Sequence, residues 1–172
     1  MSFNAITYFR DVATRMKAIG HTNAAPRFFR ASNVMQLQEL LQSLAVASYP
    51  ALVIFDKRDG RFEDQTSNNL VDRQYYQLLI LKPAGIEDSD QRQQAIDDCF
   101  AIIRRIISRM TRDWLTANRG LPDVHGLRNL DRGSMYYNSI GPLVDNLFGM
   151  ELVFTLREPV DTKFNADDWA DD

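Results

Sequence analysis

The sequence has few of the residues on which catalytic and metal sites depend. It contains one cysteine, Cys99, and two histidines, His21 and His125, which are far apart in the chain. A single cysteine excludes a disulfide within the chain and is typical of a reducing compartment. Neither histidine has a cysteine or an acidic residue at metal-ligand spacing, so we expect no metal site and no cofactor.

Glycine-rich motifs and long apolar runs are also missing. The eight glycines are scattered singly, so nucleotide binding through a glycine-rich phosphate loop is not expected. The longest uncharged run, from Leu40 to Phe55, has 16 residues and includes a proline. A membrane helix needs about 20 apolar residues. The N-terminus has no basic and apolar leader, so we expect neither a secretory signal nor a membrane partner.

Charge is balanced over most of the chain and acidic at its end. There are 20 basic and 23 acidic residues, and from Glu158 to Asp172 six acids are accompanied only by Lys163. We expect one domain over residues 1–159, followed by an acidic, flexible tail over residues 160–172. Specific nucleic-acid binding is not expected, because it needs a concentrated basic surface.

Apolar periodicity predicts three helices. Residues at three- and four-residue spacing indicate a first helix from Asn4 to Ala18 and a second from Asn33 to Ala45. The strongest pattern predicts a third helix of about 30 residues, which Ser89 caps at its start and Gly120 closes. We interpret Cys99, which falls on its apolar stripe, as a buried small hydrophobic residue rather than a nucleophile. The stripe consists of Ile96, Cys99, Phe100, Ile103, Ile106, Ile107, Met110 and Trp114.

Four segments have the composition of strands, and their order predicts the fold class. YPALVIFD (49–56) and RQYYQLLILKP (73–83) should form an antiparallel hairpin with a long polar loop, in which Asp59 and Gly60 make a tight turn. SMYYNSIGPL (134–143) and FGMELVFTLRE (148–158) follow the long helix. We therefore predict an α+β fold, with a mainly antiparallel sheet of about four strands, the long helix packed across one face, and additional N-terminal helices.

The last strand has only apolar side chains on one side and both polar and apolar side chains on the other. We expect the apolar side to meet the long helix and the other side to meet solvent or a second subunit.

The outer face of the long helix carries a ridge of arginines. Arg105, Arg109 and Arg112 recur at positions i, i+4 and i+7. Like charges at this spacing repel one another by about a few tenths of a kcal/mol each. An ordinary hydrated face is one interpretation. The other is that a counter-charge comes from the acidic tail at Asp167 and Asp168, from a neighbouring subunit, or from nucleic acid.

The order of elements resembles that of the tail-terminator, or tail-completion, proteins of long-tailed bacteriophages and prophages. The segments that carry the likeness are an N-terminal helix, YPALVIFD and RQYYQLLILKP, the helix start SDQRQQAIDDCFAII, and MYYNSIGPLVDNLFGMELVFTLREP. The resemblance implies a non-enzymatic protein that forms a ring, often a hexamer. Such a ring ends polymerisation of the tail tube and meets the head connector. The implied location is the bacterial cytoplasm during assembly and then the virion tail.

The resemblance also implies where contacts would form. A closed ring needs heterologous contacts between copies, and its partners would be tail-tube and head-connector proteins. The polar segment with Arg58 and Arg61, and the tail with Asp167 and Asp168, would become ordered on such contacts.

Two other functions remain open. One is a protein-binding adaptor that works as a monomer or dimer. The other is a small hydrolase with a site among His125, Asp123 and Asp131, although the sequence offers no nucleophile with a positioned base.

Overall fold

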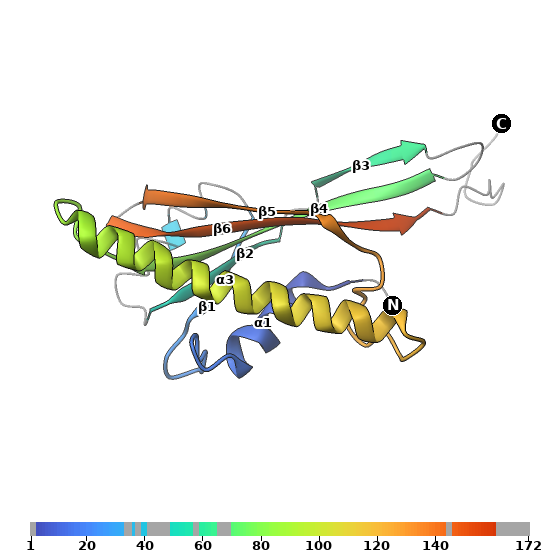
Figure 1. The fold of residues 1–172 in the computed structure, drawn as a ribbon, viewed down its shortest axis with the longest axis horizontal. Coiled ribbons are helices and arrows are strands. Elements are labelled where there is room, and N and C mark those ends of the chain that lie inside the picture. The colour runs from blue at the N-terminus through green and yellow to red at the C-terminus, as the bar shows by residue number, and fades with distance from the viewer. Residues whose placement is uncertain are drawn as a thin grey trace, which may run out of the picture.

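In the described part of the chain, helices α1 and α3 lie against one face of a six-stranded sheet (Figure 1). The computed structural model describes residues 3–32, 36, 39–40, 49–56, 59–64, 70–143 and 146–160. The predicted α+β class is therefore confirmed. Most of the predicted helix from Asn33 to Ala45 lies outside the described residues, as does the acidic tail from Asp161 onward.

The sheet is mixed and has more strands than predicted. Its order is β1-β2-β4-β6-β5, and β3 pairs with β4 next to the end of β2. Strands β1 and β2 are parallel, and every other neighbouring pair is antiparallel. The prediction of about four strands missed two. The strands are β1 (Phe28–Ala31), β2 (Ala51–Phe55), β3 (Asp59–Asp64), β4 (Leu70–Pro83), β5 (Leu130–Leu143) and β6 (Leu147–Pro159).

Strand β3 occupies part of the segment predicted to be a loop. The prediction that Asp59 and Gly60 form a tight turn is wrong, because they pair with Tyr75 and Gln74 of β4. Gly60 is needed for close strand approach instead, since a Cβ there would lie 2.9 Å from the Arg73 carbonyl oxygen. The two strands β2 and β3 thus form one side of a long hairpin with β4, interrupted between Phe55 and Asp59.

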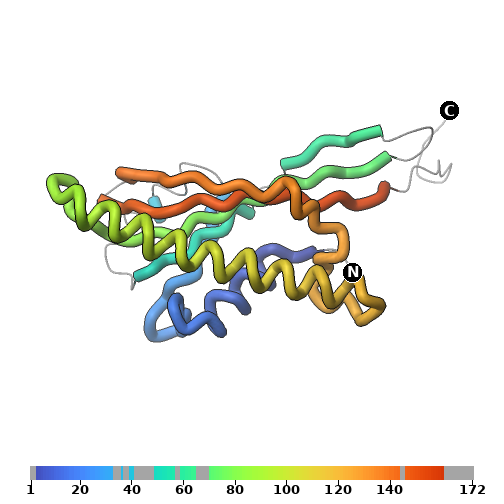
Figure 2. Tube along the Cα trace, in the orientation of Figure 1, coloured from blue at the N-terminus to red at the C-terminus, as the bar shows by residue number. Residues whose placement is uncertain are grey.

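One end of the sheet is formed by β3 and the strand segments beside it. Residues 59–64 of β3 pair with residues 70–75 of β4, and residues 71–75 of β4 pair with residues 155–159 of β6. We call these segments of β3, β4 and β6 the arm. Figure 2 shows the arm at the end of the sheet where the chain leaves β6.

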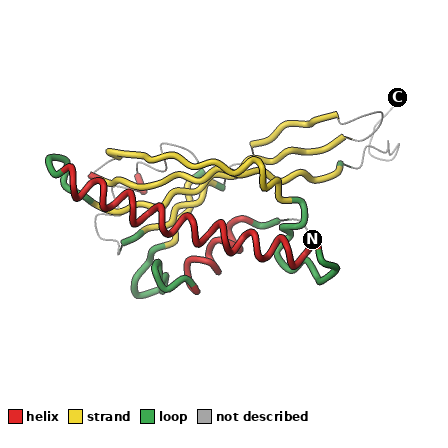
Figure 3. The backbone as a smooth tube through the Cα atoms, in the orientation of Figure 1, coloured by secondary structure: helices red, strands yellow, loops and turns green. Residues whose placement is uncertain are grey.

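The two helices pack on the same face of the sheet (Figure 3). Helix α1 (Ala5–Arg15) starts at Asn4, whose side chain accepts a hydrogen bond from the Thr7 backbone N–H. Helix α3 (Ser89–Asn118) is capped by Asp88, so the prediction that Ser89 is the cap is wrong: the Asp88 side chain accepts hydrogen bonds from the backbone N–H groups of Asp90 and Gln91. None of the described helices is long and apolar enough to cross a membrane. The core between helices and sheet includes Phe9, Ile103, Ile106, Leu152 and Phe154.

The opposite face of the sheet, which we call the open face, is not uniformly exposed. At the end away from the arm it carries a second apolar cluster that includes Val53, Leu79 and Leu81. Leu40 packs against this cluster. The expectation that this face of the sheet meets only solvent or a second subunit is therefore wrong for this end. Toward the arm, the same face carries polar and charged side chains.

Candidate interaction surface

The arginine ridge of α3 is largely neutralised within the chain. Arg109 Nε lies 2.6 Å from the Asp113 carboxylate, and Arg109 Nη2 lies 3.7 Å from Asp11 of α1. Arg112 Nη2 lies 3.0 Å from Asp113, which also accepts a hydrogen bond from the Tyr8 hydroxyl at 3.0 Å. Asp113 thus joins α1 to α3. No counter-charge from the tail or a neighbour is required for Arg109 or Arg112.

The environment of Asp113 explains its ionised state. Burial opposes the charged form, yet hydrogen bonds from Arg109, Arg112 and Tyr8 hold the pKa of the Asp113 carboxyl below its usual value. Burial and the neighbouring Asp113 charge raise the pKa of Tyr8 above its usual value, so its hydroxyl stays protonated and donates.

The other predicted interface residues lie in different places. Arg105 is exposed on α3, beside Arg104, and neither makes an ion pair within the described part of the chain. Arg61 lies on β3 in the arm. Arg58, Asp167 and Asp168 lie outside the described residues.

The structure does not bring the proposed hydrolase residues together. The Asp123 carboxylate accepts hydrogen bonds from the backbone N–H groups of Leu127 and Arg128. The His125 ring packs edge-on against Tyr8 on the helical side, whereas Asp131 lies on the open face, in register with Thr155. Asp123, His125 and Asp131 thus each contact different groups and do not form one site.

Cys99 is fully buried, as predicted. Burial raises the pKa of its thiol to about 12, which leaves almost no thiolate at neutral pH.

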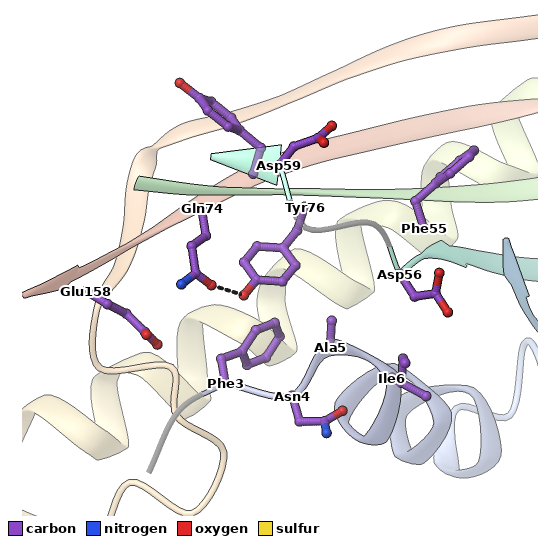
Figure 4. A pocket seen from close by; sticks show the side chains of 11 residues that line it. Phe3, Asn4, Ala5, Ile6, Phe55, Asp56, Asp59, Gln74, Tyr76 and Glu158 are labelled. Atoms are coloured by element: carbon purple, nitrogen blue, oxygen red, sulfur yellow. Dashed lines mark hydrogen bonds between the residues drawn. The ribbon is translucent and has the colours of Figure 1, made fainter. Parts of the chain in front are cut away.

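A pocket of about 250 Å³ lies between the start of α1 and the sheet (Figure 4). The Tyr76 hydroxyl donates to the Gln74 side-chain oxygen at 2.7 Å, and the Gln74 amide donates to Asp72 at 2.8 Å. Asp56 lies at the rim, where Arg30 and Ser32 hold it. Three of the polar side chains that line the pocket, Tyr76, Gln74 and Asp56, thus have hydrogen-bond partners within the protein.

Three arginines face one another across the arm. Arg61 of β3 is in register with Arg73 of β4, which is in register with Arg157 of β6. We call these three residues the arginine row. Two carboxylates bridge them: Glu63 lies 2.6 Å from Arg61 and 3.1 Å from Arg73, and Asp131 lies 3.0 Å from Arg157 and 3.7 Å from Arg73.

The arginine row lies beside a shallow pocket on the same face. This pocket, of about 240 Å³, has two carboxylates in its lining, Asp59 of β3 and Glu151 of β6. The other lining residues are Phe55, Tyr75, Tyr76, Gln77, Tyr136 and Val153. Sequence patterns did not identify the row, because its members are far apart in the chain and meet only through strand register.

Strands β1, β3 and β5 each pair with one strand only in the described part of the chain, so each leaves one edge unpaired. Phe62 on β3 is 67% exposed, and Tyr136 and Tyr137 on β5 are about half exposed. An unpaired strand edge presents backbone N–H and C=O groups to which another strand can pair. Together with the open face, these edges form the candidate interaction surface.

Comparison with family models, with curated proteins and with solved structures finds no match to this chain.

Proposed function

We propose that this chain is a structural protein that joins copies of itself into a ring, and that the ring ends tail-tube polymerisation and meets the head connector in a long-tailed bacteriophage or prophage. The observation that carries the proposal is the presence of two unlike sheet edges, β3 and β5, on opposite sides of the same sheet. Unlike edges favour heterologous contacts, which form a ring when the rotation from copy to copy closes.

Strand direction makes these two edges compatible. Strand β3 is antiparallel to β4, β4 to β6, and β6 to β5, so β3 and β5 run in opposite directions. A second copy in a similar orientation would therefore place its β3 antiparallel to β5 of the first. The antiparallel order of the sheet would continue from copy to copy.

The two edges lie at different positions along the strand direction, and this offset defines how the copies would be arranged. Strand β3 lies level with residues 155–159 of β6, whereas β5 pairs mainly with residues 149–153. Neighbouring copies must therefore be displaced along the strand direction, and the ring closes when the strands are inclined to its axis.

Replacing Phe62 with lysine tests the proposed edge contact. The side chain is 67% exposed, so the substitution should leave folding of one copy almost unchanged. A lysine on an edge strand opposes strand pairing, and we expect the dissociation constant for self-association to rise at least about tenfold. Sedimentation velocity at micromolar concentration measures this effect. The matched control is Val124→Lys, which changes a 63% exposed residue in the loop after α3.

Two outcomes would contradict the proposal. One is equal effects of the Phe62 and Val124 substitutions on self-association. The other is a wild-type chain that stays monomeric at all concentrations and does not bind assembled tail tubes. The second outcome would favour the adaptor function.

A further inference from the structure

The last two-thirds of α3 and the loop after it hold a surplus of positive charge. From Cys99 to Arg128 the chain has six arginines and two aspartates, a net charge of 6 − 2 = +4. One of the aspartates, Asp113, is shared by two of these arginines. The other, Asp123, accepts hydrogen bonds from two backbone N–H groups. Neither α3 nor the loop therefore supplies a counter-charge for the remaining arginines.

Four of these arginines lie on one strip of α3. At 3.6 residues per turn, they fall within about 100° of one another around the helix axis. All four are exposed, and we call them the arginine face; they are Arg104, Arg105, Arg112 and Arg119. Within the described part of the chain, Arg104, Arg105 and Arg119 make no ion pair.

The carboxylates near the arginine face are either paired or distant. Two of them, Asp11 and Asp98, are each bound to a basic residue. The pairs are Asp11 with Arg15 and Arg109, and Asp98 with Lys82. A third, Asp97, lies seven residues before Arg104, which is about 10 Å along the helix axis. The arginine face therefore keeps its positive charge.

One short segment of the chain carries the opposite charge. Residues 161–172, outside the described part of the structure, have the sequence DTKFNADDWADD. Five aspartates and one lysine give a net charge of 1 − 5 = −4, equal in size to the surplus on α3 and its loop. The segment also contains Phe164 and Trp169, and aromatic rings stack on guanidinium groups.

The segment begins close enough to reach the arginine face. Strand β6 and helix α3 end at the same end of the molecule (Figure 1). The Arg157 backbone N–H donates to the Asn129 carbonyl at 2.9 Å, and the Asn118 side chain, at the end of α3, donates to the Arg128 carbonyl at 3.2 Å. Twelve extended residues span at most about 40 Å. The arginine face extends about 22 Å along α3, from Arg104 to Arg119.

The arm, where the segment begins, does not compete for it. On the open face of the arm, the three arginines of the arginine row are matched by three carboxylates, which are Asp59, Glu63 and Asp131. The face of the arm toward the helices carries acidic side chains and no basic side chain of the arm. These acidic residues are Asp64, Asp72 and Glu158. An acidic segment is therefore repelled from one face of the arm and not attracted to the other.

We infer that residues 161–172 turn back and dock along the arginine face of α3 in the same chain, with their aspartates on Arg104, Arg105 and Arg119. A tethered segment has an effective concentration in the millimolar range, so a dissociation constant of about 0.1 mM for the free segment is sufficient. The docked segment excludes other anionic partners from this face. The inference goes beyond the proposed function and does not rest on ring formation.

Cross-linking by a carbodiimide, which joins an amine to a carboxylate without a spacer, tests the docking. Arginines do not react, so one chain carries Arg105→Lys and Arg119→Lys, and the control chain carries Arg61→Lys and Arg157→Lys. All four positions are exposed and keep their charge. Mass spectrometry should find the cross-link to residues 161–172 at least about fivefold more often in the first chain. Salt at about 1 M, where the Debye length is about 3 Å, should lower this yield.

Isotope labelling identifies the copy that supplies the segment. In a mixture of ¹⁴N and ¹⁵N chains, cross-linked peptides from one chain carry a single isotope. Products that combine the two isotopes would assign the segment to a neighbouring copy and overturn docking within the chain. Equal yields from the two pairs of lysine substitutions would overturn the arginine face as the docking site.

Peptide binding tests the same contact without the tether. The receptor is the full-length chain with its five C-terminal aspartates, 161, 167, 168, 171 and 172, changed to Asn, so that its own segment does not compete. A fluorescein-labelled peptide of residues 161–172 should bind it with a dissociation constant of about 0.1 mM, as measured by anisotropy. The pair Arg104→Gln and Arg105→Gln should lower affinity by about tenfold.

The matched control for peptide binding is the pair Arg61→Gln and Arg157→Gln, which removes the same charge from the arm and should leave affinity unchanged. Equal losses from the two pairs would indicate unspecific charge attraction and overturn the inference. Absence of saturable binding up to about 5 mM peptide would also overturn it.

Discussion

Replacing Asp113 with alanine removes the group that joins α1 to α3. The Asp113 side chain is only 8% exposed and accepts hydrogen bonds from Tyr8, Arg109 and Arg112. Loss of a charged acceptor for the buried Tyr8 hydroxyl costs about 1.5–3 kcal/mol, and loss of the partly buried Arg109 pair costs about 1 kcal/mol more. Arg112 is mostly exposed, so its pair contributes little. We therefore expect Asp113→Ala to lower the free energy of unfolding by about 3 kcal/mol.

Urea unfolding followed by circular dichroism measures this loss. With a slope of about 2 kcal/mol per molar urea, the midpoint should fall by about 1.5 M. The control is Asp97→Ala on the same helix, where the exposed carboxylate accepts only from Gln93 and the expected cost is below about 0.5 kcal/mol. Equal midpoint shifts for the two variants would refute the assignment of Asp113 as the link between the helices.

The pH dependence follows from the lowered pKa of Asp113. A carboxyl whose pKa is lower in the folded than in the unfolded chain stabilises the fold above its unfolded pKa, and this stabilisation is lost as pH falls through the folded pKa. The difference in unfolding free energy between wild type and Asp113→Ala should therefore stay constant from neutral pH down to about pH 4. It should become smaller below pH 3.8, the usual pKa of an aspartate carboxyl. A difference that narrows between neutral pH and pH 5 would contradict this account.

Two further predictions follow from close packing. A Cβ at Gly149 would lie 1.9 Å from the Ile80 carbonyl oxygen, so Gly149→Ala should lower the free energy of unfolding by about 3 kcal/mol or prevent folding. The control is Gly133→Ala, where the nearest contact of a Cβ is at 3.5 Å and the urea midpoint should change little. Native Cys99 should react with a thiol reagent at pH 8 only as fast as the chain unfolds, and rapid labelling without denaturant would show that the thiol is accessible.

Helix α3 was predictable because several local signals agree. Its apolar residues recur at helical spacing, acidic residues lie at its start and Gly120 lies just after its end. The predicted stripe residues Cys99, Ile103, Ile106 and Met110 are buried. The alternation in β6 was equally informative, since Leu152, Phe154 and Leu156 do face the helices.

Strand β3 and the interaction surface were not predictable from local pattern. The segment DGRFED has no apolar alternation, because both of its faces are exposed, and it is a strand only because its backbone pairs with β4. The arginine row joins residues 61, 73 and 157 through strand register, which no short stretch of sequence encodes. The hydrogen bond from Tyr8 to Asp113 joins two different helices, so no short stretch of sequence encodes it, whereas the Arg109–Asp113 pair lies at positions i and i+4 of α3 and is local.

Cross-linking between the two edges tests most directly whether copies join through β3 and β5. One chain carries Phe62→Cys and another Ser139→Cys, both exposed, in a Cys99→Ala background, and the two are treated with a flexible bis-maleimide reagent. Because heterologous contacts bring different residues together, the mixture should cross-link and neither single variant should do so alone. A chain with both cysteines should give a ladder that ends at one closed species, as measured by mass spectrometry. Cross-linking of either single variant with itself, or no cross-linking of the mixture under conditions where the chain is oligomeric, would contradict the ring proposed here.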